Sequence, residues 1–286
     1  MVTDRTTRPP GLFDAGLDRD PYPVYRLLRE QHPLFRDVRL GVWVVSRYAD
    51  VAAALTDPRL VRGRSSRCCE PGDPTCAGAS SPGGQREIAE RTAYVLAARL
   101  GGRRDADLVG EFCRWLPAGV LATASRLPYE DFARLRVATT ERALASLLAN
   151  LLDHPAQLAA VRAAPGLIPR AWAESLRRNP PVHVLVRTAV RDVPLAGGTV
   201  PAGATLACLV GAAGRDPDRF ANPDRFDLHR SDTGQLTADC PAALQAQYGV
   251  RALLDAMPGL RYVDGFRPVE TGLFTRSPRS LLVRPE

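Results

Sequence analysis

The stretch AESLRRNPP, residues 173–181, decides the fold, because it places Glu174 and Arg177 three residues apart. On a helix, side chains at this spacing lie on one face and can meet. An isolated pair of this kind at the surface contributes little stability. The pair gains meaning from two stretches that follow, RTAVRDVPLAGGTVPAG (187–203) and GAAGRDPDRFANPDRFDLHR (211–230), the second of which holds Arg225 in a Pro-x-Arg-Phe setting.

Hydrophobic periodicity along the chain predicts a mainly α-helical fold with a small β-sheet. Asp20 and Pro21 mark a helix start, because aspartate is a good cap and proline fits the first helical position. The expected helices are DRDPYPVYRLLREQ (18–31), nearly everything over 87–152 with breaks at GGRRD (101–105) and RLPYED (126–131), one after Asp153 that begins at Pro155, and two more over about 167–178 and 242–256. A strand over 42–45 and short alternating runs between residues 182 and 210 predict a sheet of hairpins rather than a parallel core.

The order of these segments resembles the cytochrome P-450 superfamily of bacteria. The likeness covers residues 20–60 and nearly everything from Leu147 to the C-terminus, and it implies a truncated cytochrome P-450-like fold in one domain over residues 1–286. In that family, the Glu-x-x-Arg pair and the arginine of Pro-x-Arg-Phe form a three-way network that braces the loop beneath the haem. Glu174, Arg177 and Arg225 match these positions. Bidentate guanidinium and carboxylate bonds suit this architectural role, which does not depend on haem.

The loop that would ligate haem iron departs from the family pattern. That pattern reads Phe-x-x-Gly-x-His/Arg-x-Cys-x-Gly, and a proline begins the body of the next helix four residues after the cysteine. In SDTGQLTADCPAALQ (231–245), Pro241 matches the proline, so the ligand position falls on Thr237 or one residue to either side, and Cys240 is about three residues out of register. A thiolate ligand also needs backbone N–H groups aimed at its sulfur and a tight glycine turn. We expect Cys240 to be a buried structural thiol, with haem ligation as the alternative.

Other haem-contacting positions of the family are matched only in part. Thr139 falls on the threonine of the oxygen-activating helix, but Ala138 replaces the acid and Arg136 the close-packing glycine. Arg187 matches a propionate-binding arginine, and its other interpretation is a surface arginine on a strand. Residues 61–103 contain no histidine for the family's second propionate contact. If haem is bound, the expected contacts are therefore Cys240, Arg187 and Thr139; otherwise no cofactor is expected.

The chain is shorter than typical members of the superfamily. The missing part corresponds to the central helices that roof the substrate pocket, and we place the deletion near residues 134–143. A monooxygenase needs that roof to exclude water and to hold its substrate. We therefore assign no catalytic residue.

Charge and cysteine content argue against several other classes of protein. All 38 basic residues are arginine, and they are mixed with 31 acidic residues, so the net charge of +7 does not indicate a nucleic-acid-binding surface. No signal-peptide pattern occurs in residues 1–20, and the longest apolar stretch, near 144–152, is too short to cross a bilayer. We expect a cytoplasmic protein with reduced cysteines and no membrane contact. CCEPGDPTC (68–76) lacks paired Cys-x-x-Cys spacing, and no metal-ligand spacing surrounds His32, His154, His183 or His229, so no metal site is expected.

Three functions remain open after this comparison of motifs. The chain resembles the haem-free, cytochrome P-450-like auxiliary proteins that bind and activate glycosyltransferases of antibiotic deoxysugars, which implies a glycosyltransferase partner. The first alternative is a haem-thiolate monooxygenase with Cys240 as the axial ligand. The second is a haem-free enzyme of a natural-product pathway that carries out a cyclisation or isomerisation.

Overall fold

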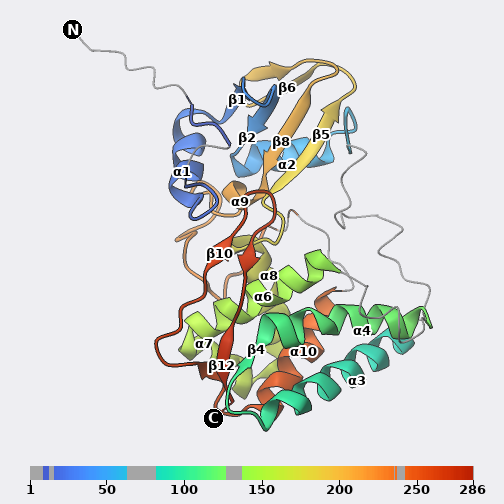
Figure 1. Cartoon of the computed structure of the whole chain (residues 1–286). Coiled ribbons are helices and arrows are strands. Elements are labelled where there is room, and N and C mark those ends of the chain that lie inside the picture. Colours follow the sequence, from blue (N-terminus) through green and yellow to red (C-terminus); the bar gives the residue numbers. More distant parts are fainter. Residues whose placement is uncertain are drawn as a thin grey trace. The chain divides into compact units, whose positions relative to one another are not determined.

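The computed structural model describes residues 9–12, 16–62, 82–126, 137–234, 236 and 242–285. They divide into two compact units, each assembled from separate segments of the chain (Figure 1). The first unit takes its residues from Met1–Arg67, Val182–Asp224 and Gly272–Thr275, and the second takes the remainder. The expected single domain and the deletion near residues 134–143 stay predictions, because much of that region lies outside the described residues.

A five-stranded mixed sheet organises the first unit. Its strands lie in the order β1 (Leu34–Asp37), β2 (Val42–Val45), β8 (Thr205–Leu209), β5 (Val184–Ala189) and β3 (Leu60–Arg62). A separate hairpin joins β6 (Val193–Leu195) to β7 (Gly198–Val200), as the alternating pattern predicts. The expectation of hairpins alone is wrong in one respect, because β2 pairs with β8 in parallel, with Val44 opposite Ala207.

In the described part of the first unit, three helices accompany this sheet: α1 (Tyr22–Gln31), α2 (Tyr48–Thr56) and α9 (Val210–Ala213). Helix α1 begins at Tyr22, one residue after the predicted first helical position, and Pro21 occupies the cap position instead. Asp20 still acts as the acceptor at this end, and the backbone N–H of Tyr22 donates to its Oδ1 at 3.2 Å. The apolar face of α1 buries Tyr25 and Leu28 in the core of this unit.

The second unit is a bundle of helices with two small sheets. The helices are α3 (Pro82–Gly101), α4 (Trp115–Ala124), α6 (Ala138–Asp153), α7 (Pro155–Ala163), α8 (Ile168–Arg178) and α10 (Ala242–Ala256), with a π-helical turn η2 (Val109–Cys113) and a 3₁₀ turn η3 (Pro165–Leu167). One sheet has the order β4 (Ala106–Asp107), β12 (Leu282–Arg284), β9 (Arg261–Tyr262), and the other pairs β10 (Glu270–Thr271) with β11 (Ser277–Pro278). These helices confirm the starts predicted at Pro155 and near Leu167 and Ala242.

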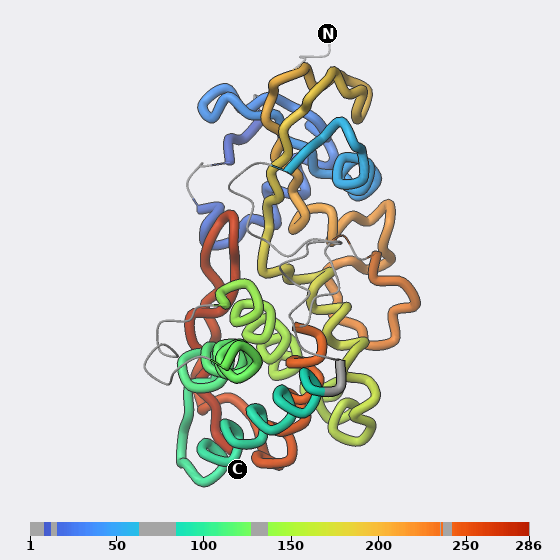
Figure 2. Tube along the Cα trace, turned by 90° about the vertical axis from the view of Figure 1, so that its right-hand side faces the viewer, coloured from blue at the N-terminus to red at the C-terminus, as the bar shows by residue number. Residues whose placement is uncertain are grey.

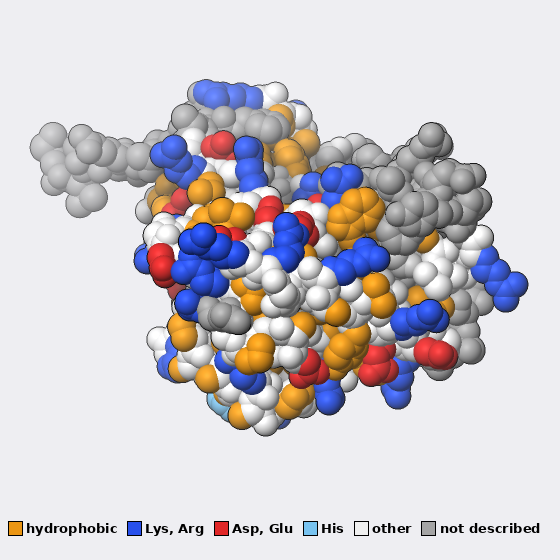
Figure 3. Space-filling model, turned by 60° about the horizontal axis from the view of Figure 1, so that its bottom comes forward, with side chains coloured by type: hydrophobic (Ala, Val, Ile, Leu, Met, Phe, Trp, Pro, Cys, Tyr) orange, Lys and Arg blue, Asp and Glu red, His pale blue; other side chains and the backbone are white. Residues whose placement is uncertain are grey.

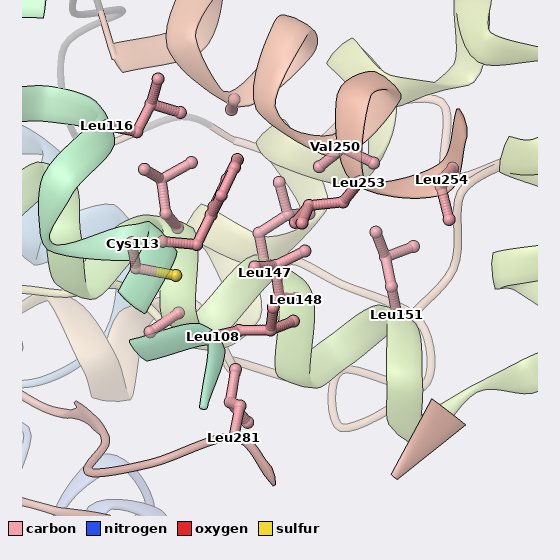
Figure 4. Close-up of a cluster of buried hydrophobic side chains, with 14 of the residues drawn as sticks. Leu108, Cys113, Leu116, Leu147, Leu148, Leu151, Val250, Leu253, Leu254 and Leu281 are labelled. Atoms are coloured by element: carbon pink, nitrogen blue, oxygen red, sulfur yellow. The ribbon is translucent and has the colours of Figure 1, made fainter. Parts of the chain in front are cut away.

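The core of the second unit forms where α3, α4, α6 and α10 meet. Helix α3 lies along α10, and Figure 2 shows their teal and orange-red traces close together. Ala89, Ala93 and Ala97 recur every four residues on α3 and are fully buried, which permits this close approach. Figure 4 shows leucines and a valine of α4, α6 and α10 pointing into one cluster with Cys113 and Leu281. The bundle is therefore held by apolar packing between segments far apart in the sequence.

The end of α3 supplies a test of this packing. A Cβ atom added at Gly101 would lie 2.6 Å from the backbone oxygen of Ala256, whereas one at the neighbouring Gly102 would meet nothing within 4 Å. We expect Gly101→Ala to lower the free energy of unfolding by about 1–3 kcal/mol, since overpacking against backbone forces a shift. Gly102→Ala, the matched control, should change it by less than about 0.5 kcal/mol. Urea denaturation followed by circular dichroism checks both, and equal midpoints would contradict the tight contact.

Candidate functional site

The most strongly built polar site of the second unit is the ion pair of α8. The guanidinium of Arg177 donates from Nε to Glu174 Oε2 and from Nη2 to Oε1, both at 2.7 Å. The two side chains are 0% and 1% exposed. A bidentate pair of this geometry is directional, and because it is buried, removing one partner would leave the other charge uncompensated. The predicted pairing of Glu174 with Arg177 is confirmed.

The third member of the brace differs from the sequence prediction. Arg230 is the residue whose side chain joins Glu174, with its Nε donating to Oε1 and Oε2 at 3.2 Å each. Arg225 contributes its backbone carbonyl, which accepts from Arg177 Nη2 at 3.0 Å, while its side chain is exposed. The physical reason is that Phe226 is fully buried, so the chain turns the Arg225 carbonyl rather than its side chain toward α8.

Further bonds fasten the same segment to α7 and α8. The backbone N–H of Asp227 donates to Glu174 Oε1 at 3.0 Å, so this carboxylate receives bonds from two guanidinium groups and one amide. Gln157 on α7 accepts from the Leu228 N–H at 2.9 Å and donates to the Phe226 carbonyl. These bonds therefore fasten the segment 225–230, which precedes Gly234 in the chain, to α7 and α8.

The described part of that loop does not match the ligation pattern. Gly234 has φ of 50°, a left-handed conformation that suits the glycine of the family's turn. Counted from it, the basic position falls on Leu236 and the cysteine position on Ala238. Neither residue type can perform the required role, so these positions do not fit a thiolate-ligated haem. Thr237, Ala238 and Cys240 lie outside the described residues, so these three positions are compared by sequence alone.

The two other residues matched to haem contacts lie in different units. Thr139 is in the first turn of α6, half-buried, one residue after the helix begins. Arg187 is on β5 of the first unit, 3% exposed, and its Nη1 donates to the Val186 carbonyl at 3.2 Å. The interpretation of Arg187 as a surface strand arginine is wrong, because β5 is an inner strand of its sheet, flanked by β8 and β3. Arg136 is not among the described residues.

Two histidines are buried wholly or in part. His154, at the start of α7, is half-buried, and its Nδ1 lies 2.7 Å from the Asn150 carbonyl. In the first unit, His183 is 1% exposed and its Nδ1 lies 3.2 Å from the hydroxyl of Tyr25. Both rings therefore have structural hydrogen bonds.

A second polar network in the second unit was not expected from the sequence. Asn150 donates from Nδ2 to Ser175 Oγ at 3.0 Å and accepts from Arg178. Asn179 in turn donates to Glu270 at 3.1 Å, and Arg276 donates to Glu270 at 3.2 Å. No sequence motif identifies this network, because its residues are scattered over more than a hundred positions of the sequence. It ties α6 and α8 to the β10–β11 sheet.

Neither metal nor thiol chemistry is indicated by the described residues. Among them, no three or more His, Cys, Asp or Glu side chains gather as a metal site would require. Burial, with a smaller contribution from Glu141, raises the pKa of Cys113 well above its usual value, so this thiol stays protonated and unreactive. The cluster Cys68, Cys69 and Cys76 lies outside the described residues.

Charged side chains of both signs are mixed on the face of the molecule that Figure 3 shows. Figure 3 shows one face, on which arginine side chains are interspersed with acidic, apolar and neutral ones rather than gathered into one block. Within the described ranges, no helix is both long enough and apolar enough to pass through a bilayer.

Comparison with known proteins places this arrangement in a family. Residues 167–239, which hold the brace, match the family Cytochrome P450. Protein DesVIII of Streptomyces venezuelae is 30% identical over 334 residues, covering 88% of this chain and 83% of DesVIII. The Cytochrome P450 family protein EryCII of Saccharopolyspora erythraea is 30% identical over 304 residues, covering 86% of this chain and 84% of EryCII. The alignment with DesVIII is longer than the 286 residues of the chain, so it includes positions that the chain lacks.

Other similarities are shorter or concern the fold alone. Pulcherriminic acid synthase of Bacillus subtilis is 35% identical, but the chain spans only 40% of its length. Among solved structures, P450BioI in complex with an acylated Acyl Carrier Protein has a TM-score of 0.81 at 23% identity, with 94% of this chain and 100% of that chain covered. The mainly helical, cytochrome P450-like fold predicted from the sequence is thereby confirmed. The chain belongs to the cytochrome P450 family.

Proposed function

We propose that this chain is a haem-free member of its family that binds and activates a glycosyltransferase in natural-product biosynthesis. The observation that carries the proposal is the contrast between two neighbouring features. The buried brace around Glu174 is complete, whereas the positions counted from Gly234 hold Leu236 and Ala238 in place of the basic residue and the cysteine. A chain that keeps the scaffold without the ligand pattern is suited to a binding role.

Similarity over nearly the whole length supports the same proposal. DesVIII and EryCII are each matched over more than four fifths of their length, and the motifs of this chain resemble those of auxiliary proteins of glycosyltransferases. The alternative is a haem monooxygenase that uses Cys240, and matches to proteins named as P450 monooxygenases, such as PikC of Streptomyces venezuelae, favour it.

Absorption spectroscopy separates these two functions. We expect the protein, expressed with ample haem precursor and purified, to show no Soret band and no shift under carbon monoxide after reduction. The matched control is Cys240→Ala, which should give the same featureless spectrum as the wild type. A red wild-type preparation whose Soret band is lost in Cys240→Ala would establish the monooxygenase instead.

Co-expression tests the auxiliary role directly. We expect a glycosyltransferase encoded in the same gene cluster to co-elute with this chain in size-exclusion chromatography and to gain activity from it. The gain should persist in Cys240→Ala, because the proposed role needs no iron ligand. Separate elution together with unchanged transferase activity would reject the role.

A further inference from the structure

A groove with a volume of about 960 Å³ runs along α3 in the second unit. One wall is α3 itself, and the opposite wall is formed by η2 and α4, from Glu111 to Thr123. Among the described residues that line it, none belongs to the brace formed by Glu174, Arg177 and Arg230. In the described part of the chain, the groove is therefore separate from the brace.

The residues of the groove repeat every four positions on both walls. On α3 the inner row includes Ile88, Leu96 and Leu100, and on the other wall Trp115, Gly119 and Thr123 follow the same spacing. Side chains in rows of this spacing form ridges, and a second helix can pack its own side chains into the grooves between them. The inner row runs from Gly84 to Leu100, about 24 Å at the rise of an α-helix. The shape is suited to a helix of about four turns laid along α3.

The positive charge along α3 indicates which kind of helix could bind in the groove. The outer row of α3 carries Arg91, Val95 and Arg99, all exposed, so that an apolar side chain stands between two cations. At one end of the groove, Arg103 is already paired with Glu111. A helix with an apolar row and two carboxylates about eight residues apart would match Arg91 and Arg99 while covering Val95, which is 47% exposed.

We propose that this groove docks an amphipathic, acidic helix of the glycosyltransferase, so the inference rests on the proposed function and names the surface that serves it. Trp115 and the apolar inner row bind the buried side of that helix. Arg91 and Arg99 fix its register through carboxylates on its flank. Such a contact is governed by a few central anchors and by complementary charge.

Charge reversal and its matched control test the proposal by titration calorimetry of the purified partners. We expect the double variant Arg91→Glu/Arg99→Glu to weaken the complex at least about tenfold, which corresponds to about 1.4 kcal/mol. Val95→Asp should weaken it to a similar extent, since it places a charge under the docked helix. The control for the double variant is Arg162→Glu/Arg170→Glu, which changes the net charge by the same amount at exposed positions of α7 and α8. The control for Val95→Asp is Leu121→Asp, which adds the same charge at an exposed position of α4 that does not line the groove. These controls should bind as the wild type does.

A photoreactive benzoylphenylalanine at Val95 identifies the occupant. A crosslink to the glycosyltransferase, mapped by mass spectrometry to an acidic helix, supports the proposal. A crosslink to a second copy or within the same chain overturns it. If the wild-type complex forms but the groove variants bind as well as their controls, the groove is rejected and the auxiliary function stands. If no complex forms with wild-type protein, both are rejected.

Discussion

Replacing Glu174 with alanine is expected to lower the free energy of unfolding by about 3–5 kcal/mol, because the change leaves buried charge uncompensated. Glu174 is the common acceptor for Arg177 and Arg230 and for the Asp227 amide. Removing it strands the fully buried guanidinium of Arg177 and releases the segment that precedes α10. Urea denaturation monitored by tryptophan fluorescence and circular dichroism measures the loss.

Two arginine variants serve as controls for the Glu174 result. Arg225→Ala keeps the backbone carbonyl that accepts from Arg177 and removes only an exposed side chain, so it should change stability by less than about 0.5 kcal/mol. Arg230→Ala removes a real partner of Glu174, whose Nε lies 3.2 Å from the carboxylate, and should cost about 1–3 kcal/mol. If Arg225→Ala proves as damaging as Glu174→Ala, the assignment of Arg230 as the third member is wrong.

The second large effect is expected from the core of the second unit. Leu147 is fully buried on α6, among side chains of η2 and α10 (Figure 4). Leu147→Ala should lower the free energy of unfolding by about 2–5 kcal/mol, through lost transfer energy and the cavity that remains. The same denaturation experiment measures it.

Leu121→Ala is the matched control for Leu147→Ala. Leu121 lies on neighbouring α4 but is 42% exposed, so its truncation should cost less than about 0.5 kcal/mol. Similar losses of stability at the two positions would mean that the Leu121 side chain is buried by a part of the protein beyond the described helices.

Much of the fold could be predicted because its signals are local. Pro155 begins α7 and the periodic segment from Ala242 forms α10, as expected from proline placement and apolar spacing. The Glu174–Arg177 pair could be predicted as well, since both residues belong to one helix and the resemblance to a known family gave the pair its meaning. Helix signals of this kind are contained within a few turns of sequence.

Features that depend on distant segments could not be predicted in the same way. Arg225 and Arg230 are equally basic in the sequence, and it is the folded chain, with Phe226 buried between them, that brings the Arg230 side chain to Glu174. The parallel pairing of β2 with β8 joins residues about 160 positions apart, and the sequence of neither strand indicates which strand it pairs with. Arg187 is an ordinary strand arginine by sequence, and its burial follows from the strands on both sides of β5.

The partnership of α3 with α10 has a consequence for synthesis on the ribosome. Helix α3, with Ala89, Ala93 and Ala97 fully buried, packs mainly against α10, whose residues 242–256 emerge about 150 codons later. During that interval the nascent chain exposes an apolar helix face, the kind of surface that chaperones bind and that leads to aggregation. Premature termination before codon 242 would therefore yield an insoluble fragment rather than a smaller folded protein.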